Sequence, residues 1–151
     1  MSEKQSQKNH DNSTATLTIQ WLSYAFWGWL AVSLVWLSAI VFSFFIDPAS
    51  NVSGLGDAII YPVSATIVLL ILSIVTDLFY SKREPVKKEG SANLLMIIHT
   101  VIFSLLAVAA AITAVFSILN TLLSENSTGS TIALYTSLLV LLFLLALLFR
   151  I

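Results

Sequence analysis

Cysteine is absent from the 151 residues of this chain, and charged residues are scarce. Without cysteine the chain can form no disulfide, no thiolate nucleophile, no cysteine-ligated zinc site and no iron–sulfur cluster. Asp, Glu, Lys and Arg make up only 10% of the residues, whereas an ordinary soluble domain contains about 25%. The formal net charge is -1, and no basic stripe lies beside aromatic residues, so we expect no nucleic-acid partner.

Hydrophobic residues make up 58% of the chain, and the mean hydropathy is +0.93. They gather in four long runs, residues 19–46, 57–80, 93–123 and 131–149. Each run can cross the ~30 Å hydrocarbon layer as a helix, and only a helix satisfies every backbone group within one lipid-embedded segment. The sequence therefore predicts an all-α bundle of four transmembrane helices, a multi-pass membrane domain at 17–151. The polar segment 1–16 is expected to be a disordered cytoplasmic tail.

The distribution of basic residues predicts the orientation of these helices. The stretch "SKREPVKKEG" (81–90) joins the second and third runs and holds four of the seven basic residues. Under the positive-inside rule this connection lies in the cytoplasm, which places the N and C termini there too. The remaining basic residues fall on the same side: Lys4, Lys8 and Arg150. The other two connections, "DPASNVSGLG" and "SENSTGS", contain no Lys or Arg.

Two ionisable residues inside the runs are candidates for function, because charge is costly in lipid. Asp77 in the second run and His99 in the third would lie at similar depth if the two runs form an antiparallel hairpin. A hydrogen bond between them would fix the imidazole tautomer and favour its charged form. A candidate polar face continues from Asp77 along the second run and would suit a proton or cation path: Thr66, Ser73 and Tyr80.

The alternative for this pair is structural. Asp77 could reach the membrane interface and pair with Lys82 or Arg83 there. His99 could bond only a backbone carbonyl.

Small residues form a heptad-like stripe along the third run: Thr100, Ser104, Ala107, Ala111 and Ala114. Small side chains let helices approach closely in lipid. We therefore expect the third helix at the centre of the bundle, against the first or second. The alternative is that an alanine-rich helix contains such a stripe by chance.

The first run contains all four tryptophans. Trp29 and Trp36 share a face with Trp21, whereas Trp27 points elsewhere. That face could bind a pigment, a quinone or a lipid tail, or it could serve ordinary packing and interfacial anchoring.

The order of these segments resembles a family of small four-helix prokaryotic membrane proteins that is defined only as a domain of unknown function. The resemblance rests on "IIYPVSATIVLLIL", on the charged "SKREPVKKEG" turn, and on "ITAVFSILNTLL" followed by "TIALYTSLLVLL". It implies the four-helix architecture and a prokaryotic cytoplasmic membrane, and it implies no site residues.

These observations predict a function that involves no catalysed reaction. No nucleophile–base set, metal-spaced cluster or phosphate-binding glycine loop is present, so we expect no enzyme, no cofactor and no metal. The leading expectation is a structural or accessory subunit that packs in the bilayer against copies of itself or against a larger membrane complex. The alternative is an oligomeric channel or proton-linked transporter that uses the Asp77/His99 path.

Overall fold

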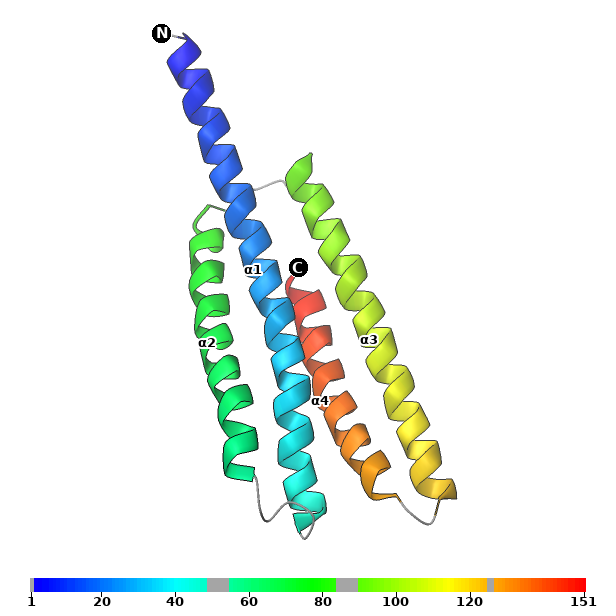
Figure 1. Cartoon of the computed structure of the whole chain (residues 1–151). Helices are drawn as coiled ribbons and strands as arrows, with labels where there is room; N and C mark the ends of the chain where they lie inside the picture. The colour runs from blue at the N-terminus through cyan, green and yellow to red at the C-terminus, as the bar shows by residue number, and fades with distance from the viewer. Residues whose placement is uncertain (1, 49–54, 84–89, 125–126) are drawn as a thin grey trace.

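The computed structural model describes residues 2–48, 55–83, 90–124 and 127–151. Within these ranges the chain forms four α-helices and no strand. Their bounds are α1 Ser2–Ile46, α2 Leu55–Ser81, α3 Ser91–Leu123 and α4 Thr128–Arg150. The helices run antiparallel to their neighbours in the chain, so both termini lie at one end of the bundle (Figure 1), called here the termini end.

All four helices are long and apolar enough to cross a membrane. The membrane-compatible segments have mean hydropathies between 2.3 and 2.7 and cover Thr14–Ile46, Gly56–Ser81, Ser91–Leu123 and Thr128–Arg150. The predictions of an all-helical fold and of a multi-pass membrane protein are therefore confirmed. Apart from the start of α1, the ends of the helices agree with the predicted runs to within a few residues.

The start of α1 lies within the segment 1–16, for which a disordered cytoplasmic tail stays a prediction. Its backbone is helical from Ser2 onward, and this first part of the helix projects beyond the other three (Figure 1). Once a helix has nucleated, each added residue contributes a backbone hydrogen bond without a new nucleation cost. The apolar part of α1 can therefore extend the helix into polar sequence.

The helices are arranged in the order α2, α1, α4, α3 across the bundle (Figure 1). α1 packs extensively on α2 and α4 and touches α3, whereas α3 packs mainly on α4. No Cα atom in the described part of α2 comes within 8 Å of one in α3 or α4. The expectation that the third helix occupies the centre is therefore wrong, and α1 lies there.

The composition of α1 explains its central place. Small or short polar residues lie around much of its circumference, and four of them are buried: Ser23, Ala31, Ser33 and Ser38. Gly28 lies next to the Phe103 ring of α3, and a Cβ atom at that position would lie 3.4 Å from it. Small side chains on several faces let α1 accept neighbours on several sides.

The stripe of α3 faces into the bundle. Ala107 and Ala114 are buried, and the other three members are half-buried: Thr100, Ser104 and Ala111. Ala107 belongs to the apolar core together with Val140 and Leu144 of α4. The stripe therefore lies on the packed side of α3, with α4 as its main neighbour.

Candidate functional site

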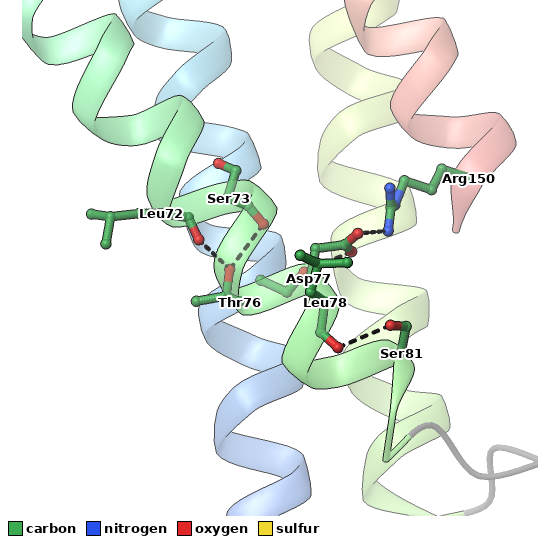
Figure 2. Close-up of polar contacts among 8 residues, drawn as sticks. Leu72, Ser73, Thr76, Asp77, Leu78, Ser81 and Arg150 are labelled. Carbon is green, nitrogen blue, oxygen red and sulfur yellow. Dashed lines mark hydrogen bonds and ion pairs between the residues drawn. The ribbon is translucent and has the colours of Figure 1, made fainter.

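Asp77 lies near the C-terminal end of α2 and connects three helices. Its Oδ2 atom forms an ion pair with Nη2 of Arg150 in the last turn of α4 (Figure 2). Ser23 of α1 donates a hydrogen bond to Oδ1 at 3.4 Å. The side chain of Asp77 is only 17% exposed, whereas that of Arg150 is 48% exposed. The long arginine side chain thus spans a gap that the backbones of α2 and α4 leave open.

Arg150 is favoured at this position by two further interactions. A cation in the last helical turn is stabilised by the partial negative charge at the helix C-terminus. The guanidinium carbon also lies 5.7 Å from the centroid of the Trp27 ring of α1, within the range of cation–π attraction. Arg150 therefore links the end of α4 to both α1 and α2.

His99 lies beside the same part of α1 but has other partners than Asp77. Its Nδ1 atom is 2.9 Å from the carbonyl oxygen of Leu95, and a carbonyl only accepts, so Nδ1 carries the hydrogen. Its ring packs on Tyr24, with 4.9 Å between centroids, and on Phe103 at 6.1 Å. The structure thus brings Asp77 and His99 to consecutive residues of α1, Ser23 and Tyr24, and gives each a separate set of contacts.

The candidate polar face of α2 is directed at α1. Thr66 donates a hydrogen bond to the carbonyl oxygen of Pro62 at 2.7 Å, and it shares a second one, also 2.7 Å, with Ser33 of α1. Tyr80 is 5% exposed and meets the Tyr24 ring edge-on, at 6.4 Å between centroids. Ser73 is completely buried. Thr66 and Tyr80 therefore join α2 to α1.

Several buried polar atoms near this site have no hydrogen-bond partner within the described residues: Gln20 Oε1, Tyr24 OH, Trp27 Nε1 and Ser73 Oγ. The first three lie on α1 at spacings of four and three residues, which places them on one helix face. The amide nitrogen of Gln20 is bonded, because it donates to the Ala92 carbonyl of α3 at 3.0 Å. Buried polar groups in proteins are normally satisfied, so this face of α1 is unusual.

A cavity of about 50 Å³ lies beside Tyr24 and Trp27 at the termini end. Its polar lining includes five residues that we call the polar cluster: Ser23, Tyr24, Trp27, Asp77 and Arg150. Of these five, only Asp77 is a candidate site residue by its sequence context. The spacing of Gln20, Tyr24 and Trp27 was the available signal, since a helical face with three hydrogen-bonding side chains is out of place in lipid.

A second hollow, of about 320 Å³, lies near the middle of α1, α3 and α4. Its lining is mainly apolar and rich in small residues, including Ala31, Ala109, Ala110 and Ala133. Thr136 also lines it, and its hydroxyl is buried without a hydrogen-bond partner in the part of the chain that the structure describes. We call this hollow the mid-membrane groove.

Trp29 and Trp36 lie on the outer surface of α1. They are 64% and 49% exposed, and the Trp36 ring packs against Tyr61 of α2 at 5.3 Å between centroids. In a membrane these indoles would contact lipid or a partner. Binding of a pigment, a quinone or a lipid tail by this face stays a prediction.

No group of three or more His, Asp or Glu residues that could hold a metal ion occurs among the residues that the structure describes. The polar cluster offers instead one carboxylate, one guanidinium and several hydroxyl or N–H groups around a small cavity. This set can bind and orient hydrogen-bonding molecules, and it can exchange protons. No family model, no curated protein and no solved structure matches this chain, so its function is argued from its own residues.

Proposed function

We propose that this chain is a structural or accessory subunit of a membrane assembly, which packs through its mid-membrane groove against a transmembrane helix of a partner. The partner is a second copy of the chain or a larger membrane protein. The groove carries this proposal. A transmembrane helix associates best where small side chains let backbones approach, and the groove is lined by four alanines from α1, α3 and α4.

Two features of the groove support a helix as its occupant. It lies at the middle of three membrane-spanning helices, where an approaching apolar helix would fit. The hydroxyl of Thr136 is available there for a hydrogen bond to that helix, and interhelical bonds of this kind stabilise by about 0.6 kcal/mol on average.

The hydrogen bonds and the ion pair between helices of the chain also support a structural role. Thr66 and Ser33 bond each other, and Asp77 is engaged by Arg150 and Ser23. A path through one chain along the polar face would have to break these contacts.

The orientation belongs to the same proposal. With the basic 81–90 segment in the cytoplasm, the termini end is the cytoplasmic end. Both termini then face the cell interior, in a prokaryotic cytoplasmic membrane.

Filling the groove tests the proposal. Ala110→Phe should block a partner helix, because Ala110 lines the groove. Ala146→Phe is the matched control, since Ala146 is an exposed residue of α4 outside the groove lining. After mild detergent extraction from its native membrane, the wild-type chain and the control should migrate as an assembly, and the groove variant as a monomer. A wild-type chain that is monomeric in both detergent and bilayer contradicts the proposal.

The second candidate function is an oligomeric channel or proton-linked transporter. The observation that favours it is the group of buried, unpartnered polar atoms beside Asp77. Flux of protons or cations into liposomes that contain only this chain would support it if Asp77→Asn abolished the flux. Liposomes with no flux above the protein-free background would exclude it for the isolated chain.

A further inference from the structure

We infer that the cavity of the polar cluster is a binding site for water, in which ordered molecules link Tyr24 and Trp27 to the Asp77–Arg150 ion pair. This site is independent of the groove, so it does not rest on the proposed function. It would make the ion pair accessible to the aqueous phase from one side of the membrane only.

The groups that line the cavity call for a small ligand that both donates and accepts hydrogen bonds. Trp27 Nε1 can only donate, whereas the Tyr24 hydroxyl donates and accepts. Both atoms are buried and have no partner among the residues described by the structure. Asp77 and Arg150 bring one negative and one positive charge, so an added ion of either sign would meet a like charge. A neutral, bifunctional molecule fits all of these groups at once.

The size of the cavity fits water. A buried water needs roughly 10–15 Å³ of such volume and about three hydrogen-bonding partners, and the cavity holds about 50 Å³. The space therefore admits a few water molecules, and it is too small for a lipid headgroup or a nucleotide. Water would also satisfy the indole N–H and the phenol, whose desolvation is otherwise costly in a membrane.

The cavity opens toward the termini end. Arg150 is 48% exposed, and Ser81, an exposed residue at the end of α2, also lines the cavity. The lining also contains two buried apolar side chains, Phe103 at 3% and Leu147 at 5% exposed. Water can therefore enter from the termini end and meets apolar side chains within the bundle.

Tryptophan fluorescence in lipid vesicles tests the site. Replacing Trp21, Trp29 and Trp36 by Phe leaves Trp27 as the single emitter, and a matched variant retains only Trp29. We expect Trp27 to emit at longer wavelength than Trp29 and to brighten more in D2O, because only Trp27 would bond water. Lipids brominated on the acyl chain should quench Trp29 more strongly. A Trp27 emission no longer in wavelength than that of Trp29, with equal quenching, would overturn the inference.

If the single-Trp27 variant does not fold into vesicles, thiol labelling tests instead whether water reaches the cavity. The chain contains no cysteine, so Ser23→Cys and Ser38→Cys each introduce a unique thiol at a buried position of α1. Ser23 lines the cavity and Ser38 does not. A thiol reacts as the thiolate, which needs water. A small methanethiosulfonate reagent should modify Ser23→Cys several-fold faster, and equal rates at the two positions would overturn the inference.

Discussion

Two pairs of consecutive helices pack against each other, α1–α2 and α3–α4, and they are held together by different means. The α1–α2 contact contains hydrogen bonds between side chains, Ser23–Asp77 near the termini end and Ser33–Thr66 near the middle of the two helices. In the α3–α4 pair, Ala107 packs against Val140 and Leu144, and a hydrogen bond from Asn120 to Ser130 lies near the connection. Similar hairpins are thus built from unlike side chains.

The difference follows from the solvent. Burying apolar surface between helices gains little when lipid is as apolar as the core, so close van der Waals fit must hold α3 to α4. Hydrogen bonds add directional attraction between α1 and α2. Some buried polar atoms of these two helices do not take part in such bonds. Those extra atoms lie at the termini end, beside the ion pair. The α1–α2 side can therefore bind polar molecules, and the α3–α4 side serves packing.

The largest effect should come from adding bulk to the α3–α4 contact. Ala107 is 6% exposed within the core, so Ala107→Leu forces the helices apart and should lower the free energy of unfolding by about 2–3 kcal/mol. Reversible unfolding in mixed micelles measures this. Ala146→Leu, at an exposed position of α4, is the control and should change it little. Equal losses in both variants would show that α3 and α4 are not closely fitted.

Removing Arg150 should have the next largest effect. Arg150→Ala leaves the mostly buried carboxylate of Asp77 without its cation. We expect a loss of about 2 kcal/mol, between the values for exposed and buried ion pairs. Lys82→Ala, which removes an exposed basic residue just after the end of α2, should lose much less in the same unfolding assay. If Lys82→Ala lowered the free energy of unfolding as much as Arg150→Ala, the effect would come from the change in net charge and not from the ion pair.

Removing one hydrogen bond between hydroxyl groups should lower the free energy of unfolding by a smaller amount. Thr66→Val keeps the shape of the side chain and removes its bond to Ser33, with an expected loss of about 0.6 kcal/mol. Thr76 bonds only carbonyls of its own helix, those of Leu72 and Ser73 (Figure 2). Thr76→Val should therefore be close to neutral. If the two valine variants unfold alike, the bond across the α1–α2 contact contributes nothing.

The smallest effect is expected for His99→Phe. The new ring can keep the contacts with Tyr24 and Phe103 and loses only a bond to the backbone of its own helix. Stability and any transport activity should stay close to those of the wild-type chain. Loss of activity in His99→Phe and Asp77→Asn alike would instead support the Asp77/His99 pair expected from the sequence.

Hydropathy and periodicity predicted the helices and their inward faces well. The four membrane-spanning segments follow from the length of the apolar runs, because lipid allows little besides helices. The inward faces also follow from spacing: the predicted residues of α2 and α3, such as Thr66 and Ala107, lie on packed sides.

The lateral neighbours of each helix could not be predicted in this way. Hydropathy does not say which helices touch, and the assumption that consecutive helices pack placed Asp77 beside His99. In the structure α1 lies between them, and the partner of Asp77 is Arg150, 73 positions further along the chain. Arg150 was assigned to the aqueous flank because it follows the last apolar run, and its long side chain reaches back into the bundle.

Exchanging the charges of the ion pair tests most directly whether Asp77 and Arg150 hold α2 and α4 together across α1. Asp77→Arg and Arg150→Asp each place two like charges where the structure has an ion pair, so each single variant should unfold much more readily than the wild-type chain. The double variant restores opposite charges and should recover most of the lost stability. A double variant that is as unstable as the sum of the two single losses would contradict this account.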